Sequence, residues 1–297
     1  MRSPPPSLIL PGHPRHAELS RLAREVERLS GGPTTLEERF PGMLRRVVDD
    51  VVDTVNTRRR SYGQLEKTEK TYLGTRVEIL MRAMMRVPKG RLDFIIGGAD
   101  VDMKFTITGN WMIPQEAVGH ACLLAALDEQ KSRCFLGLFQ ADPANLTGGA
   151  NRDGKRGVSA FGTTQILWLL RDLPVEPNFW RTIPEPLVER IFSAPTGNDK
   201  IVALFRGVTG RPISRRIVEE TAAQKDFMRR IRSDGPSGSR NRLAAEGIVL
   251  LSGTYDAVLI RALGLPRCGP GDFISHRVRP EEEELCATCG WRIRSAL

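Results

Sequence analysis

The sequence predicts an α/β (α+β) protein with two domains. Helical spacing of apolar residues over 16–29 and 64–85 precedes two short runs, 92–96 and 100–106, that resemble strands. A proline-rich stretch over 172–186 then separates this part from several further helical patterns. A chain of 297 residues allows one large or two ordinary domains, each with its own core.

The domain boundaries follow from these shifts in composition. We predict a first domain over 1–172, with a loose proline-rich arm at 1–15. A linker is expected over 173–186, and a second domain over 187–297.

The first domain opens with helices. Apolar residues of 16–29 recur with helical spacing, and Gly31, Gly32 and Pro33 end that helix. Capping boxes predict a second helix to about Thr57. A third helix over 64–85 carries Glu78 on a face that can reach the following strands.

The run over 100–106 places charged side chains on one strand face, because successive side chains of a strand point to opposite sides. The charged face holds Asp100, Asp102 and Lys104, and Asp93 lies on the preceding short run. Asp93 followed by Asp102 and Lys104 fits the D…(D/E)-x-K signature of metal-dependent nucleases. Taken alone, the pattern is more often that of a half-exposed strand with a solvated face.

The rest of the first domain is less regular. Residues 116–127 are too apolar for periodicity to separate a buried helix from a strand, and 134–139 is expected to be a strand. A glycine-rich loop follows, GGANRDGKRG, which is either an exposed polar loop or a contact to phosphate or bases. Its candidate DNA-binding residues are Asn151, Arg152, Lys155 and Arg156.

Charge points to a polyanionic partner. The formal net charge is +9, and 200–242 holds eleven basic against four acidic residues, a local +7. Nucleic acid is favoured over a membrane surface. No apolar run approaches the ~18 residues of a membrane span. Five unevenly placed cysteines suit a reducing cytoplasm.

The second domain is expected to bind DNA through a helix-turn-helix. Helical patterns cover 186–193, 200–207 and 214–231, and a turn at 210–212 joins the last two. A strand over 247–251 suggests a winged form. The candidate DNA-binding residues here are Arg211, Arg215, Arg216, Arg229, Arg230 and Arg232.

The C-terminal end offers a candidate structural zinc site. Its Cys-x-x-Cys spacing is that of a zinc knuckle, although the upstream pair is widely spaced. The alternative is a tail with reduced thiols. The candidate ligands are Cys268, His276, Cys286 and Cys289.

Several blocks together resemble the NaeI-type restriction endonucleases, from about Leu44 to about Leu265. The blocks stand in the family's order: QLEKTEKTYLGTRVEI, VDMKF, WMIPQEAVGHACL, GGANRDGKR, IFSA, LFRGVTGRPISR, QKDFMRRIR and EGIVLL. The chain departs from the wider nuclease pattern at Leu92, where a proline often stands. Asp100 adds a further carboxylate that could compete as a ligand, and the C-terminal Cys/His set is not typical of the family.

The resemblance implies a restriction-endonuclease-like mixed sheet flanked by helices, followed by a catabolite-activator-like helix-turn-helix domain. It implies a magnesium-dependent type II enzyme that acts as a homodimer on double-stranded DNA, cutting a GC-rich palindrome while the second domain binds an effector copy. The implied catalytic set is Glu78, Asp93, Asp102 and Lys104. The three carboxylates would hold Mg²⁺, with Glu78 as an additional or water-mediated ligand.

Two other functions stay open at this stage. The chain could be a non-catalytic DNA-binding regulator, although the complete set of acidic residues and lysine counts against that. It could also be a nickase or a topoisomerase-like enzyme on the same scaffold, which ranks lower because no obvious tyrosine or serine nucleophile accompanies the acids.

Overall fold

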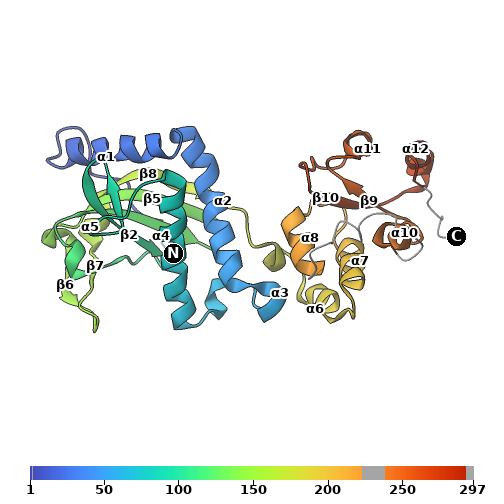
Figure 1. Cartoon of the computed structure of the whole chain (residues 1–297), viewed down its shortest axis with the longest axis horizontal. Helices are drawn as coiled ribbons and strands as arrows, with labels where there is room; N and C mark the ends of the chain where they lie inside the picture. Colours follow the sequence, from blue (N-terminus) through green and yellow to red (C-terminus); the bar gives the residue numbers. More distant parts are fainter. Residues whose placement is uncertain (2, 223–237, 292–297) are drawn as a thin grey trace. The chain divides into compact units, whose positions relative to one another are not determined.

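The computed structural model describes the chain of 297 residues except residues 2, 223–237 and 292–297. The chain forms two compact units, Met1–Arg181 and Thr182–Leu297 (Figure 1). The division falls within the stretch expected to be a linker.

Helices of the first unit follow the apolar stripes of the sequence. The first helix buries Leu19, Leu22 and Val26. The second was expected to continue to about Thr57 but is interrupted at Asp53, which has a left-handed φ of 45°. The helical elements of this unit are α1 (His16–Leu29), α2 (Pro33–Val52), α3 (Thr54–Thr57), η1 (Tyr62–Gln64), α4 (Lys67–Met85), η2 (Gln115–Ala117), η3 (Pro143–Asn145), α5 (Ala160–Thr164) and η4 (Phe179–Thr182).

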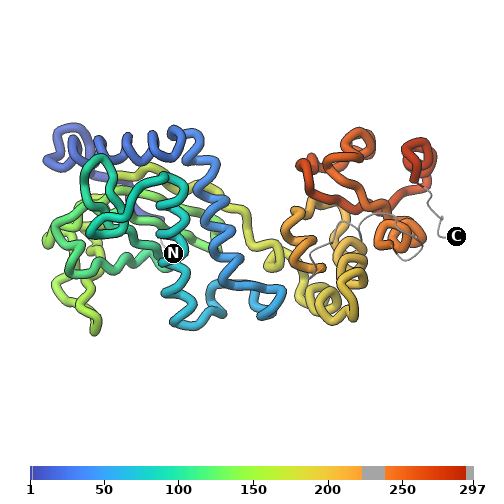
Figure 2. The backbone as a smooth tube through the Cα atoms, in the orientation of Figure 1, coloured from blue at the N-terminus to red at the C-terminus, as the bar shows by residue number. Residues whose placement is uncertain are grey.

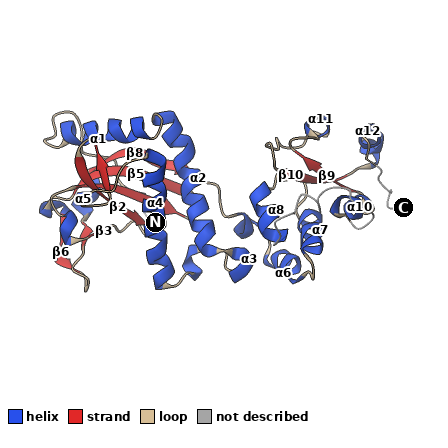
Figure 3. Ribbon diagram, viewed as in Figure 1, coloured by secondary structure: helices blue, strands red, loops and turns tan. Residues whose placement is uncertain are grey.

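A five-stranded sheet of order β1-β2-β4-β5-β8 forms the centre of this unit, with helices against it (Figure 3). Strands β2 and β4 run parallel and the other neighbours antiparallel, so the sheet is mixed. The stretch 116–127, undecided from periodicity, contains most of β4, every residue of which is buried. Its strands are β1 (Phe94–Ile96), β2 (Ala99–Thr106), β4 (Ala121–Asp128), β5 (Arg133–Gln140) and β8 (Ile166–Pro174).

Each face of this sheet carries its own core. Leu123 and Leu138 belong to the core formed with α1, α2 and α4. Leu124 and Phe139 point the other way, into a second core with Trp111 and residues of a small sheet of order β3-β7-β6. The small sheet is built from β3 (Met112–Ile113), β6 (Leu146–Ala150) and β7 (Arg156–Val158).

The proline-rich N-terminal segment is held against β8, in contrast to the loose arm expected from its composition. Trp168 Nε1 donates to the Pro5 carbonyl at 3.2 Å, and Arg171 Nη2 donates to the Pro4 carbonyl at 2.9 Å. Ile9 is buried in the core on the helical side. Proline sets an extended backbone but does not prevent its carbonyls from accepting hydrogen bonds.

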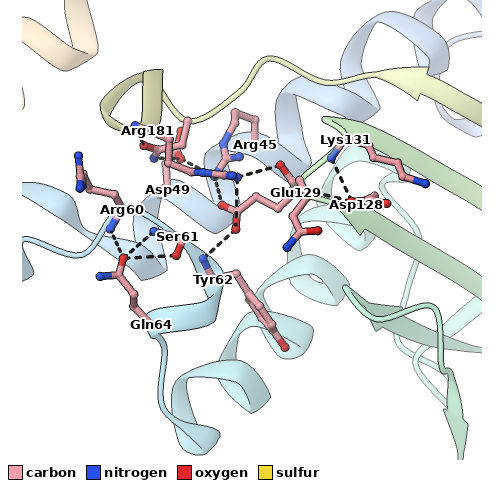
Figure 4. A network of polar contacts seen from close by, with 12 residues as sticks. Arg45, Asp49, Arg60, Ser61, Tyr62, Gln64, Asp128, Glu129, Lys131 and Arg181 are labelled. Carbon is pink, nitrogen blue, oxygen red and sulfur yellow. Dashed lines mark hydrogen bonds and ion pairs between the residues drawn. The ribbon is translucent and has the colours of Figure 1, made fainter. Parts of the chain in front are cut away.

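A buried polar cluster fixes the end of the first unit (Figure 4). Arg45 Nη2 lies 2.6 Å from Asp49 Oδ1 and 3.7 Å from Glu129 Oε1. Arg181 Nη1 donates to the Glu129 carbonyl at 2.8 Å, and Asn178 Nδ2 donates to Asp49 at 2.7 Å. These five residues, the Arg45 cluster, attach η4 to α2 and to the turn between β4 and β5. The first part of the predicted linker is therefore anchored.

The second unit is mainly helical. Helix α7 packs against α6, α8 and α10, and β9 pairs antiparallel with β10. Ile213, which precedes α8, forms an antiparallel bridge with Phe273 of β10. The described elements are α6 (Glu185–Ser193), α7 (Gly197–Gly207), α8 (Arg215–Ala222), α10 (Ser239–Ala244), β9 (Ile248–Ser252), α11 (Ala257–Ala262), β10 (Phe273–Arg277), η5 (Pro280–Glu282) and α12 (Glu283–Thr288). Within the described part of the chain, no helix has the length and apolar character needed to cross a membrane.

Candidate active site

The β1–β2 hairpin positions the candidate catalytic residues. Gly97 and Gly98 have positive φ values of 55° and 80°, which lets the chain reverse between the two strands. Asp93 immediately precedes β1, while Asp102 and Lys104 lie on one face of β2. The turn therefore brings together residues that are about ten positions apart.

Lys104 links the two aspartates. Its Nζ lies 2.7 Å from Asp102 Oδ2 and 3.8 Å from Asp93 Oδ2. Asp93 Oδ2 also accepts a hydrogen bond from the Met103 backbone N–H at 2.7 Å, which fixes the orientation of this carboxylate. The arrangement places an ammonium beside two carboxylates, as the sequence pattern predicts.

Burial gives Asp102 an unusual affinity for protons. Its side chain is only 5% exposed, and this burial raises the pKa of Asp102 to about 6, although the neighbouring Lys104 favours the charged form. The carboxylates of Asp93 and Glu116 raise the pKa further.

Glu78 lies near this group on α4. Val77 beside it is buried in the core, and Glu78 Oε1 is 3.4 Å from Arg82 Nη1. Burial raises the pKa of Glu78, and the Asp93 carboxylate adds to the effect, so the two acids are within electrostatic reach. The predicted catalytic set is thus brought to one region of the structure.

Two other acids on these segments differ from expectation. Asp100 was considered a competing ligand, but its Oδ1 accepts hydrogen bonds from the backbone N–H groups of Arg91 at 2.8 Å and Leu92 at 3.4 Å. It therefore stabilises the segment before β1. Glu116 on η2 acts electrostatically on Asp102, yet it lies outside the D…(D/E)-x-K spacing, so spacing alone could not identify it.

The donor set suits magnesium. In the described ranges, no three His, Cys, Asp or Glu side chains converge closely enough to enclose a metal ion, so Glu78, Asp93 and Asp102 form no preformed three-ligand cage. Mg²⁺ commonly uses only one or two carboxylates together with waters and substrate phosphate. The hard oxygens of Asp93 and Asp102, the latter buried and with a raised pKa, fit such a site.

The predicted zinc site is not formed by the described residues. His276 Nε2 lies 2.7 Å from Glu282 Oε2, and Cys286 is buried in an apolar cluster with residues of β9 and α11. Cys289 is exposed, and Cys268 packs at the rim of the same cluster. The expectation of zinc from the Cys-x-x-Cys spacing was wrong here because the buried cysteine serves as a small apolar side chain.

The candidate DNA contacts of the first unit fall into two kinds. Asn151 Oδ1 accepts from the backbone N–H groups of Asp153 and Lys155, and Arg156 Nε donates to the Thr147 carbonyl at 2.6 Å. These two side chains hold the β6–β7 hairpin together. Arg152 is exposed and Lys155 half-exposed, and no ion pair joins either to another described residue.

The candidate DNA contacts of the second unit are largely paired with acids. Arg215 lies 2.8 Å from Glu219 and Arg216 lies 2.6 Å from Glu220 along α8. Arg211 Nη1 donates to Thr182 Oγ1 at 2.5 Å. The high positive charge of this segment is thus partly neutralised by neighbours. The other candidates lie outside the described residues: Arg229, Arg230 and Arg232.

Comparisons with known proteins identify the family of the chain. The model of the family described as restriction endonuclease NaeI matches residues 30–287. The chain is also 37% identical over 256 residues to the type II restriction enzyme NaeI of Lentzea aerocolonigenes, covering 83% of this chain and 80% of that protein. The chain therefore belongs to the NaeI family of restriction endonucleases, enzymes that hydrolyse double-stranded DNA at specific sites.

Proposed function

We propose that the protein is a magnesium-dependent type II restriction endonuclease whose active site comprises Asp93, Asp102 and Lys104, with Glu78 nearby. The observation that carries the proposal is the position of Lys104 Nζ, 2.7 Å from Asp102 and 3.8 Å from Asp93. A carboxylate pair bridged by one lysine is typical of metal-assisted phosphodiester hydrolysis.

Asp93 and Asp102 would hold Mg²⁺, with Glu78 acting through a water molecule. When bound, the ion supplies positive charge at the scissile phosphate and eases deprotonation of the attacking water. The hydrogen bond from Met103 N–H keeps the Asp93 carboxylate oriented, and burial shields the Asp102 carboxylate from solvent. Carboxylates that are already held in position need not rearrange during the reaction.

Lys104 orients the attacking water and stabilises the developing charge. The water oxygen forms a bond to phosphorus while the bond from phosphorus to the leaving ribose oxygen breaks. The attacking water gives its proton to bulk solvent, and the leaving oxygen takes a proton from solvent water. Lys104 Nζ also donates to the Met103 carbonyl at 3.0 Å, which keeps the ammonium at the position where it can act.

The second unit is proposed to be a winged helix-turn-helix domain. The bridge from Ile213 to Phe273 and the pairing of β10 with β9 place a strand residue, β10 and β9 side by side. Helix α10 comes directly before β9 in the chain, the place of the recognition helix in winged domains. Helix α8 (Arg215–Ala222) is the described part of the helix predicted over 214–231, and the rest of that helix lies outside the described residues.

Four further properties are proposed for this chain only because it belongs to the NaeI family: its oligomeric state, its recognition site, its effector binding and its location. A homodimer would place one active site on each strand of a palindrome and so give a double-strand break. The palindrome is proposed to be GC-rich, because arginine pairs bidentately with guanine. The second unit is proposed to bind an effector copy, and the enzyme to act in the cytoplasm.

Plasmid cleavage tests the proposal. Purified protein is incubated with GC-rich plasmids, methylated and unmethylated, in Mg²⁺ or in EDTA, beside the Lys104→Ala protein. Discrete linear fragments are expected only with Mg²⁺ and the native lysine, and sequencing of their ends then gives the site. Retarded but uncut plasmid in every lane would instead indicate a DNA-binding regulator. Nicked or relaxed circles alone would indicate a different DNA-processing activity.

A further inference from the structure

Two exposed glycines of the β6–β7 hairpin are not required by the fold of the isolated protein. Gly148 and Gly149 lie on β6, and neither has the positive φ that favours glycine. A Cβ atom placed on either residue meets nothing within 4 Å. Glycine weakens a strand because it loses more backbone freedom on folding and offers no side chain to pack. In the isolated protein, a larger residue would therefore be tolerated at both positions.

The hairpin displays these glycines outward. The pairing register shifts between Leu146 and Ala150, so the intervening residues bulge from the small sheet. Thr147 fixes the bulge, since its Oγ1 accepts from Gly157 N–H at 3.1 Å and its carbonyl accepts from Arg156 Nε. Figure 2 shows the hairpin extending away from the body of the first unit.

The hairpin lies on the same side of the main sheet as the catalytic residues. In the β2–β4 register, Asp102 is opposite Cys122 and Lys104 is opposite Leu124. Cys122 and Leu124 point into the core that lies beneath the small sheet. Paired residues of neighbouring strands point to the same face, so Asp102 and Lys104 also face this side.

Charge complementarity selects the partner for this surface. Arg152 is exposed at the tip and Lys155 is half-exposed beside it, and in the described structure neither forms an ion pair. Asn151 and Arg156 are engaged within the hairpin and hold it in shape. A hairpin held together by its own hydrogen bonds, with two cations that form no ion pair with the described residues, matches a phosphate backbone.

We propose that the backbone of Gly148 and Gly149 lies in direct contact with duplex DNA, with Arg152 and Lys155 beside it on phosphates and Asn151 and Arg156 as positioning residues. This inference rests on the proposed nuclease function, because it assumes that DNA occupies the face of Asp102 and Lys104. The glycines are then required by the complex, since a side chain would separate the hairpin from the DNA.

Substitution of the glycines tests the proposal. Gly148→Ala and Gly149→Val are compared with wild type in gel-shift titrations of sheared plasmid DNA in EDTA, and thermal unfolding is measured for each. Both variants should keep or raise the unfolding temperature and bind DNA at least tenfold more weakly. Gly42→Ala is the matched control: a Cβ there also meets nothing, and its φ is not positive. It should stabilise α2 and leave DNA binding unchanged.

The outcomes separate this inference from the proposed function. Wild-type affinity in both glycine variants would overturn the glycine contact while Mg²⁺-dependent plasmid cleavage still supported the nuclease. A loss of binding accompanied by a fall in unfolding temperature would also overturn it, since the glycines would then serve the fold. No shift of DNA by the wild-type protein would overturn the inference whatever the cleavage result.

Discussion

Lys104 Nζ lies 2.7 Å from Asp102 Oδ2, and the carboxylate involved is one of the few buried acids of the first unit. The two residues are separated by one position on the same strand, so their side chains share a face. The Asp102 carboxylate thus holds the Lys104 ammonium in place, and replacing either residue changes the electrostatic environment of the other.

Replacement of Lys104 by alanine should reduce DNA cleavage by about 10²–10³-fold, because an electrostatic donor at the reacting phosphate is lost. DNA affinity in EDTA should change little. Single-turnover cleavage and gel-shift titration measure the two effects. Lys67→Ala, which alters an exposed lysine of α4, should retain wild-type rates. A Lys104→Ala protein that cleaves normally would remove this residue from the mechanism.

The pKa of Asp102 predicts an unusual dependence of stability on pH. Because its folded-state pKa of about 6 lies above the ordinary value of 3.8, the protonated form is favoured by folding. Its stabilising contribution is complete below about pH 4 and is lost as the pH rises through about 6. In EDTA, Asp102→Asn should therefore raise stability by roughly 1–3 kcal/mol at pH 8 and change it little at pH 4.

Thermal unfolding of both proteins across this pH range checks the prediction. A lower unfolding temperature for Asp102→Asn at pH 8 would contradict it. Cleavage should respond in the opposite direction: the wild-type rate should fall below about pH 6, as protonation removes the carboxylate that a cation needs.

Removal of Arg45 should destabilise the first unit strongly. The Arg45 side chain is 9% exposed and pairs with Asp49 and Glu129, so Arg45→Ala removes the guanidinium that lies between the two acids and should cost roughly 3–5 kcal/mol. The exposed pair of Arg28 and Glu25, 2.6 Å apart, is the control. Arg28→Ala should leave urea unfolding unchanged. Equal effects of the two substitutions would show that the Arg45 cluster contributes nothing special.

The cysteines of the second unit should behave as side chains of a core. Cys286 is fully buried and Cys289 is exposed. Cys286→Ser should cost about 1–3 kcal/mol, because a hydroxyl replaces an apolar contact without a partner, whereas Cys289→Ser should be neutral. Chelator treatment should not shift the unfolding temperature. A loss of stability on chelation, with zinc released in stoichiometric amount, would show that the protein does contain a zinc site.

Local rules predicted much of the first unit. The stripe of Leu19, Leu22 and Val26 gave α1, and strict alternation placed Asp102 and Lys104 on one face of β2. The strand β4 was undecided because a strand buried on both faces has no period of two. The interruption at Asp53 depends on a left-handed residue, which no spacing rule signals.

The sequence predicted which acidic residues and which lysine lie together, but it did not predict their environment. Spacing identified Asp93, Asp102 and Lys104, yet Glu116 required the tertiary approach of η2 to β2. The zinc expectation failed because spacing says nothing about burial: Cys286 turns inward to the apolar cluster while Cys289 remains in solvent. Counting charges overstated the cationic surface of the second unit, since arginines of α8 meet glutamates one turn away.

The Arg45 cluster also defines where the first unit can be separated from the second for engineering. A truncation after residue 172, the boundary suggested by composition, deletes Asn178 and Arg181 and with them two donors to Asp49 and Glu129. A truncation after Arg181 keeps both. A chimeric protein assembled from the first unit should therefore carry its new targeting module beyond Thr182, so that the whole of η4 is retained.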